Sequence, residues 1–303
     1  MSRGLGDVYK RQTYDDYHDL KPFFVDQPYR ICEYSLPALI AWQTSAYQPW
    51  YAIADDALII AAEFPGADHQ RHLVLPIAGD RRFPPETLCR LARDLGHTAF
   101  SFVPGEYVAA YGIDRIETCF HMTEQTENED YVYRTIDLAE LTGNRYAAKR
   151  NLIRQFERQF PEPGRIRTEA ITAASAPECI AFLEAWCLER DCDADEEGDL
   201  ACEKKAIIHT LSHIDMLDVK SLLVRVDDRV SAFAVGTGLT RDMGVLHFEK
   251  AFTWIKGLYQ YVDQLCARTL FSGYRYVNKE SDMGIPGLAR AQRSYHPVMR
   301  VKS

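Results

Sequence analysis

Residues 276–297, YVNKESDMGIPGLARAQRSYHP, begin as an apolar strand and pass directly into charged side chains. A Gly-Ile-Pro-Gly turn and a short basic helix follow. A strand in a parallel sheet brings its last side chains to one edge, where open α/β sheets bind their ligands. The stretch therefore predicts an α/β fold with polar chemistry at the end of this strand. The side chains concerned are Asn278, Lys279, Glu280 and Asp282.

An earlier strand pattern, GVLHFEKA at 244–251, is joined to this one by a helical pattern at 257–271. A strand–helix–strand connection predicts a right-handed parallel crossover, so the carboxyl ends of strands 245–250 and 274–280 should share one sheet edge. Two helical patterns within 178–217 and a hairpin pattern at 220–236 precede them. Together these elements predict a mixed α/β sheet.

The polar segment MTEQTENED, 122–130, separates this half from an earlier half with a similar order of elements. That half has strand patterns at 50–62, 71–77 and 98–104 and a helical pattern at 86–96. We therefore expect two tandem units, a structural one over 13–128 and one over 129–303 that carries the site. Residues 1–12, MSRGLGDVYKRQ, show no period and are interpreted as a disordered tail or a sequence artefact.

The composition restricts the class of protein. With 303 residues, 47% of them apolar, the chain can bury its cores without disulfides or metals. No apolar run approaches the ~20 residues of a membrane-spanning helix. Eight cysteines without a CxxC pair, and no secretory signal, predict reduced thiols, a cytoplasmic location and no metal centre. The net charge of −9 argues against a general nucleic-acid coat.

Positive charge is nevertheless concentrated in two segments. Residues 145–167 and residues 268–303 each carry seven Lys or Arg against two acids. In the first segment, basic residues follow a helical pattern beside an apolar stripe. One interpretation is a solvated helix face, and the other is a surface for an anionic partner. The residues concerned are Arg145, Lys149, Arg150, Arg154 and Arg158.

Strand alternation predicts that His247 and Glu249 share one face of strand 245–250. Charges at core-facing positions are costly unless they are paired or used, which makes the strand ends a candidate active site. We predict acid–base roles for Glu249 and Glu280, and proton donation to a leaving group by Tyr295. The alternative is a set of ordinary ion pairs and a packed tyrosine. The predicted substrate-binding residues are His247, Lys250, Asn278, Lys279, Asp282 and Arg290.

The order of elements resembles the GCN5-related N-acetyltransferase fold. That fold holds the coenzyme A pyrophosphate on a glycine-rich turn after its fourth strand. The corresponding turn here, KAFTWIKGLYQ at 250–260, has Gly257 alone. Backbone N–H groups must approach the phosphates closely, which such glycines allow. An enzyme with this turn needs another acyl donor.

Three segments are similar to the C-terminal catalytic domain of bacterial phosphatidylglycerol lysyltransferases: NRYAAKRNLIRQF at 144–156, HFEKA at 247–251, and residues 276–297. The resemblance covers most of residues 13–303. It implies two tandem acetyltransferase-like domains, an aminoacyl-tRNA donor in place of coenzyme A, and a lipid hydroxyl acceptor. The matching residues are Lys149, Arg150, Glu249, Lys250, Asn278, Lys279, Glu280, Asp282, Arg290 and Tyr295.

Two departures from the family pattern affect these expectations. The segment VGTGL at 235–239 stands where relatives more often carry Gly-Glu, so one site carboxylate is missing from the pattern. No counterpart of the membrane-embedded half of full-length lysyltransferases is present either. A small-molecule acceptor is therefore expected as an alternative to a lipid.

These observations support three functions. The first is transfer of an aminoacyl group from charged tRNA to a hydroxyl or amine of a lipid or small molecule, with peripheral membrane contact and no resident cofactor. The second is coenzyme A-dependent N-acyl transfer. The third is a binding module that keeps the fold without turnover.

Overall fold

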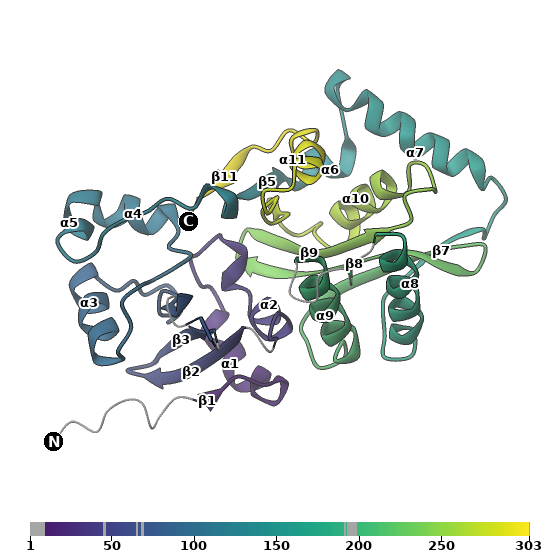
Figure 1. Ribbon diagram of the computed structural model, residues 1–303. Coiled ribbons are helices and arrows are strands. Elements are labelled where there is room, and N and C mark those ends of the chain that lie inside the picture. The colour runs from purple at the N-terminus through teal and green to yellow at the C-terminus, as the bar shows by residue number, and fades with distance from the viewer. Residues whose placement is uncertain are drawn as a thin grey trace.

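The computed structural model describes residues 10–44, 47–64, 66–67, 70–190, 192 and 199–302, with the backbone alone at 127 and 199. Two α/β units lie side by side, each with its own sheet (Figure 1). The mixed α/β class predicted from the sequence is confirmed. Residues 1–9 of the expected tail lie outside the described residues.

The N-terminal unit contains a four-stranded antiparallel sheet in the order β1-β2-β3-β4. Its strands are β1 (Lys10–Arg11), β2 (Gln48–Ala54), β3 (Ala57–Glu63) and β4 (His72–Leu73). Its α-helices are α1 (Tyr17–Phe24), α2 (Leu36–Ala41), α3 (Pro85–Asp94), α4 (Gly105–Tyr111) and α5 (Ile113–Glu117). Short 3-10 helices are η2 (Tyr14–Asp16), η3 (Cys32–Tyr34) and, in the connection to the second unit, η5 (Thr126–Asn128).

Two details of this unit differ from the sequence expectation. The strand pattern at 50–62 is a hairpin, because Asp55 and Asp56 adopt φ of 49° and 58° and reverse the chain. Lys10 and Arg11, assigned to the tail, pair with Tyr51 and Trp50 of β2.

The C-terminal unit contains a seven-stranded sheet in the order β11-β5-β10-β9-β8-β7-β6. Its strands are β5 (Asp130–Arg134), β6 (Ile166–Glu169), β7 (Lys220–Val226), β8 (Arg229–Thr240), β9 (Met243–Ala251), β10 (Tyr276–Asn278) and β11 (Met299–Val301). Its helices are α6 (Thr135–Glu140), η6 (Asn144–Tyr146), α7 (Ala147–Gln159), α8 (Ala176–Leu188), α9 (Asp199–Ser212), α10 (Leu258–Thr269) and α11 (Pro286–Arg293). Helices α8 and α9 cover one face of the sheet, and α10 covers the other (Figure 1).

The predicted crossover and hairpin are confirmed. β10 pairs in parallel with β9, and α10 connects them. β7 and β8 form the antiparallel hairpin, which turns at Asp227 and Asp228 with φ of 50° and 65°. Both positive values suit a tight hairpin turn, because its twist matches that of the flanking strands.

A bulge in β9 changes which side chains share a face. β8 pairs Val235 with Phe248 and the next residue, Gly236, with Leu246, so His247 has no partner residue on β8. One extra residue reverses the alternation of all side chains beyond it. His247 therefore contacts the N-terminal unit, while Glu249 lies on the α10 face. The prediction that His247 and Glu249 share a face is wrong.

One hydrophobic cluster joins the two units. Tyr34 and Leu58 of the N-terminal unit share it with Met243 and Val245 of β9 and Val301 of β11. Burial stabilises side chains of this size by about 1.5–3 kcal/mol each. This shared core holds η3 against the C-terminal sheet. No helix in the described ranges is both long enough and apolar enough to cross a bilayer.

Candidate active site

The strands β9 and β10 part where the polar residues begin. Their pairing ends at Val245 and Asn278, although β9 continues to Ala251. Beyond that point the chain after β10 follows β5 instead, because Lys279 N–H donates to Tyr131 O at 2.9 Å. The side chains that follow the last pair occupy the space between the strands, and they form one polar cluster on each face of the sheet.

The histidine cluster lies on the face toward the N-terminal unit. We define it as Ser35, His247 and Glu280 with their neighbours Cys32, Glu33, Asp130 and Asn278. His247 Nδ1 lies 2.7 Å from Glu280 Oε1, and its Nε2 lies 2.8 Å from Ser35 Oγ. The His247 side chain is only 2% exposed. Both ring nitrogens are therefore fixed by hydrogen bonds, and the imidazole has one orientation.

Glu280 has an unusual backbone conformation. Its φ is 60°, in the left-handed region that residues other than glycine rarely adopt. Two hydrogen bonds hold it there: Glu280 N–H donates to Asn278 Oδ1 at 2.7 Å, and Tyr131 N–H donates to Glu280 O at 3.0 Å. Strain of this kind persists where the surroundings over-determine a functional position. Here the conformation directs the carboxylate at His247.

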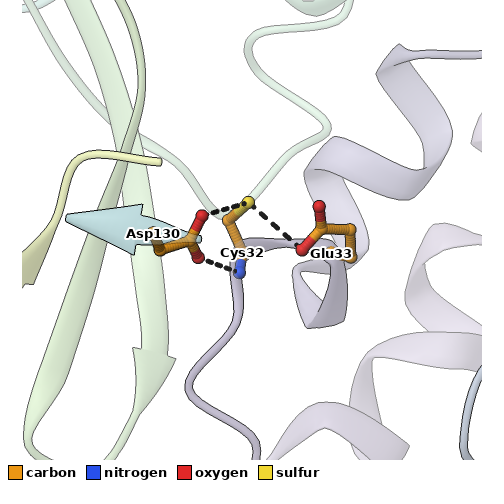
Figure 2. A group of neighbouring side chains, drawn as sticks. All are labelled: Cys32, Glu33 and Asp130. Atoms are coloured by element: carbon orange, nitrogen blue, oxygen red, sulfur yellow. Dashed lines mark hydrogen bonds between the residues drawn. The ribbon is translucent and has the colours of Figure 1, made fainter. Parts of the chain in front are cut away.

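Three further acidic or weakly acidic groups complete this cluster (Figure 2). Asp130 Oδ2 accepts from Asn278 Nδ2 at 2.6 Å and from Cys32 N–H at 2.8 Å. The Cys32 sulfur lies 3.4 Å from Asp130 Oδ1 and 3.4 Å from Glu33 Oε2. These ligand-type atoms lie within 4.8 Å of one another, a spacing that a metal ion tolerates. Burial raises the pKa of Cys32, so the thiol stays protonated and can donate a hydrogen bond to a carboxylate. This hydrogen bonding explains the short distances between the three groups without an ion.

Burial also determines the protonation of this cluster. It lowers the pKa of His247 to about 4, so the imidazole is neutral near pH 7. It raises the pKa of Asp130 to about 7, and the pKa values of Glu33 and Glu280 also rise, with neighbouring carboxylates adding to the effect. The His247–Glu280 contact therefore holds fewer charges than a surface ion pair, and a proton can occupy either partner.

Lys250 lies on the face covered by α8 and α9. Its Nζ is 2.7 Å from Glu203 Oε1 and 4.7 Å from the centre of the Trp186 ring. The predicted binding residue is thus already paired, and its charge acts on Glu280 only through space.

The lysine cluster lies on the α10 face of the parted strands. We define it as Glu249, Asp263, Lys279, Tyr295 and Lys149. Lys279 pairs with Asp263 of α10, and its Nζ is 3.3 Å from Glu249 Oε2. Lys149 Nζ lies 3.8 Å from the centre of the Tyr295 ring and donates to Ser294 Oγ at 2.6 Å. One cation therefore lies between two buried carboxylates, with a second cation close by.

The electrostatics of the lysine cluster follow from this arrangement. Burial and the Asp263 charge raise the pKa of Glu249 to about 8, although Lys279 opposes the shift. Desolvation lowers the pKa of Lys149. Glu249 Oε1 and the Tyr295 hydroxyl have no hydrogen-bond partner within the described part of the chain. The structure thus places the predicted catalytic residues Glu249 and Tyr295 together, but away from Glu280.

Two other predicted residues have different surroundings. Asp282 is buried, accepts from Tyr131 OH, and accepts from Gly284 N–H at 3.0 Å, so it stabilises the turn before α11. Arg290 lies exposed on α11.

The basic residues of α7 and η6 divide into two groups. Arg145 pairs with Asp137 at 3.2 Å, Lys149 points into the lysine cluster, and Arg150 donates to the carbonyl oxygens of Leu141 and Gly143. These three side chains bond other groups of the protein. Arg154 and Arg158 are exposed, and they remain available to an anionic partner.

Gly257 has a packing role. It precedes α10 with φ of 87°, and a Cβ at this position would lie 2.1 Å from the carbonyl oxygen of Leu152 in α7. The close approach of α7 to α10 explains why a glycine stands here. The turn offers no second glycine that would open a phosphate cradle.

Sequence reasoning missed the contribution of the N-terminal unit, which it treated as structural. Cys32, Glu33 and Ser35 come from η3 and the residue before α2, more than 200 positions from His247. No local pattern distinguishes them from ordinary loop residues. Asp130, in contrast, stands as an acid at the head of an apolar strand pattern, which could have identified it.

The chain is thus an α/β protein with polar clusters beside the parted ends of two parallel strands. The chain belongs to the family described as phosphatidylglycerol lysyltransferase, C-terminal, which matches residues 28–303. This confirms the resemblance stated from the sequence. Membership of the family supports an acyltransferase.

Two solved structures are similar to the chain over most of its length. A conserved protein of unknown function from Bacteroides thetaiotaomicron VPI-5482 is 27% identical, with 97% of each chain covered and a TM-score of 0.84. The C-terminal domain of a putative lysylphosphatidylglycerol synthetase from Agrobacterium fabrum is 14% identical, with 95% of this chain and 90% of that chain covered and a TM-score of 0.63. The latter shares the fold. The comparison with curated proteins finds no match.

Proposed function

We propose that this acyltransferase moves an aminoacyl group from charged tRNA to a hydroxyl or amine. The observation that carries the proposal is the His247–Glu280 pair, held between the parted strands β9 and β10. Acyl transfer needs a group that takes the proton of the attacking hydroxyl or amine. A neutral imidazole oriented by a carboxylate meets that need.

The buried carboxylates favour a donor that carries a positive charge. Among the described residues, no lysine or arginine forms an ion pair with Glu33, Asp130 or Glu280. Burial raises the pKa of all three groups. The α-ammonium of an aminoacyl ester would supply the missing charge, whereas the acetyl group of acetyl-coenzyme A is neutral. The site therefore favours an aminoacyl donor.

The tRNA body would contact the exposed positive charge of α7. Arg154 and Arg158 lie one helical turn apart on its surface, a spacing that suits backbone phosphates. Aminoacyl-tRNA as the donor places the reaction in the cytoplasm. The acceptor is a lipid or small-molecule hydroxyl or amine, and a lipid acceptor would require peripheral contact with the membrane.

A donor assay tests the proposal. The purified full chain is incubated with pooled labelled aminoacyl-tRNA or with acetyl-coenzyme A, and retention and release of label are followed over a range of salt. We expect salt-sensitive tRNA binding, with the slope of log K against log salt reduced by about 2 in the Arg154→Ala, Arg158→Ala double variant. The exposed Arg82→Ala in the N-terminal unit is the control.

Other outcomes favour the other functions. Turnover of acetyl-coenzyme A without tRNA binding would establish coenzyme A-dependent transfer instead. Binding of either ligand without turnover, in wild type and His247→Ala alike, would establish the binding module.

A further inference from the structure

Ser35, His247 and Glu280 form an unbroken chain of hydrogen bonds. The Ser35 Oγ–His247 Nε2 distance is 2.8 Å, and the His247 Nδ1–Glu280 Oε1 distance is 2.7 Å. The three residues come from separate elements: the residue before α2, the bulge of β9, and the chain after β10. Hydroxyl, imidazole and carboxylate in this order form the nucleophile, base and orienting group of covalent acyl-transfer sites on unrelated folds.

The Ser35 hydroxyl has no role in its own helix. Ser35 occupies the N-cap of α2, where a serine hydroxyl ordinarily accepts a backbone N–H bond, yet its side chain makes no capping bond. The backbone of Ser35 is satisfied separately, because its N–H donates to Cys32 O at 3.1 Å and its C=O accepts from Leu39 N–H at 3.0 Å. Among the described residues, the hydroxyl bonds only His247.

The position of Ser35 is rigid. Tyr34 and Leu36 on either side of it are buried in the core shared by the two units. At the other end of the chain of hydrogen bonds, Glu280 is held in the left-handed conformation. An ordinary hydrogen bond between buried groups would not require Ser35 to lack its capping bond. It would not require Glu280 to adopt a left-handed backbone conformation either. Both ends are arranged around the imidazole, as a nucleophilic site requires.

A surface cavity reaches Ser35. It has a volume of about 220 Å³ and lies between α1, α2 and the strands β7 and β8. Apart from Ser35, its lining includes Tyr17, Thr237, Leu239 and Tyr274. The cavity is large enough for a small acyl group.

We propose that Ser35 accepts the acyl group covalently, so that transfer passes through an acyl-Ser35 intermediate. This inference rests on the proposed function for the class of donor, an activated acyl ester. In the first step, Ser35 Oγ bonds to the acyl carbon, the ester bond to the leaving alcohol breaks, and the Ser35 proton passes through His247 Nε2 to that alcohol. In the second step, the acceptor attacks the acyl carbon, the bond from that carbon to Ser35 Oγ breaks, and the acceptor's proton passes through His247 Nε2 to Ser35 Oγ. Neither step oxidises or reduces any group.

Labelling with p-nitrophenyl acetate tests the intermediate without tRNA or acceptor. The full chain is quenched in acid, its mass is measured, and peptides are mapped after treatment with alkaline hydroxylamine, which cleaves esters and leaves surface amides. We expect one hydroxylamine-sensitive acetyl group on Ser35, absent from Ser35→Ala. His247→Ala should acquire the label at least about 100-fold more slowly. Ser231→Ala is the matched control, since Ser231 is buried in β8 and its hydroxyl donates to the Arg229 carbonyl at 3.1 Å.

Ser35→Cys keeps the measurement decisive if Ser35→Ala fails to fold, because the thiol should take the label as a thioester. A label on another residue, or none on Ser35 in wild type, would overturn the inference. So would transfer from charged tRNA at the wild-type rate by folded Ser35→Ala, and that result would leave the proposed function standing. Acetyl-Ser35 formed by a protein that uses no charged tRNA would support the inference and remove the proposed donor.

Discussion

The two polar clusters lie on opposite faces of the same pair of strands, and they differ in charge balance. In the lysine cluster, Lys279 lies between the carboxylates of Glu249 and Asp263. In the histidine cluster, Glu280 contacts a histidine whose pKa burial lowers to about 4. The first cluster is an internally paired network, whereas the second lacks a cation of its own within the described residues.

The difference in charge balance suggests different roles for the two clusters. A buried charge that is paired holds elements together, and removing its partner is costly. A buried acidic site without a fixed cation is unfavourable in the folded protein, and a cationic ligand relieves it. We therefore expect the lysine cluster to hold α10 on the sheet, and under the proposed function we expect the histidine cluster to carry out the reaction.

The largest effect expected is on turnover. Glu280→Gln should lower the rate of aminoacyl transfer by about 10²–10⁴-fold, because the imidazole loses the carboxylate that orients it. Glu249→Gln removes a carboxylate from the other face, where the side chain is 11% exposed against 23% for Glu280, and should leave most of the rate. Initial rates with charged tRNA at saturating acceptor provide the measurement. Equal losses in both variants would mean that the two clusters act as one site.

A second effect concerns folding. Lys279→Met should lower the free energy of unfolding by about 3–5 kcal/mol, since it leaves Glu249 and Asp263 buried without their shared cation. Urea unfolding followed by circular dichroism gives this value. The exposed Lys256→Met, just before α10, should stay within about 0.5 kcal/mol of wild type. A loss below about 1 kcal/mol for Lys279→Met would contradict the structural role of the lysine cluster.

A third effect is the dependence of stability on pH. The pKa of Glu249 is raised to about 8 and that of Asp130 to about 7, so the folded protein holds protons that the unfolded chain releases near pH 4. The stability contributed by these groups is complete below about pH 4 and is lost as the pH rises through about 7 to 8. We expect the urea midpoint to fall over that range.

In Glu249→Gln, the urea midpoint should fall less steeply between about pH 6 and pH 8, because one of the two titrating groups is absent. The exposed Glu157→Gln on α7 is the control and should follow the wild-type curve. A midpoint that rises with pH in wild type would show that the carboxylates are ionised and paired in the folded protein.

The parallel crossover and its charged strand ends could be predicted, because both depend on local information. Apolar periodicity identifies β9, α10 and β10, and the handedness of the connection then brings their carboxyl ends together. The resemblance to the lysyltransferase family rested on the same segments and is confirmed. Glu280 and Asn278 both lie on the face toward the N-terminal unit.

The bulge at His247 could not be predicted. It depends on how β8 and β9 pair across the sheet, and nothing in HFEKA distinguishes a bulged strand from a regular one. The extra residue at the bulge reverses the alternation of side chains along β9. Glu249 therefore lies on the opposite face from His247. Helical spacing likewise does not reveal which long side chains turn back to other groups of the chain, as Arg150 does to the Leu141 carbonyl and Lys149 to the Ser294 hydroxyl.

By itself, the sequence determined the α/β class, the order of elements and the presence of polar residues where β10 ends, because periodicity and turn residues act over a few positions. Only the tertiary structure decided which of those residues meet. Ser35 reaches His247 across 212 positions because one hydrophobic core joins the two units. Such contacts depend on packing between distant segments, and no short stretch of residues contains that information.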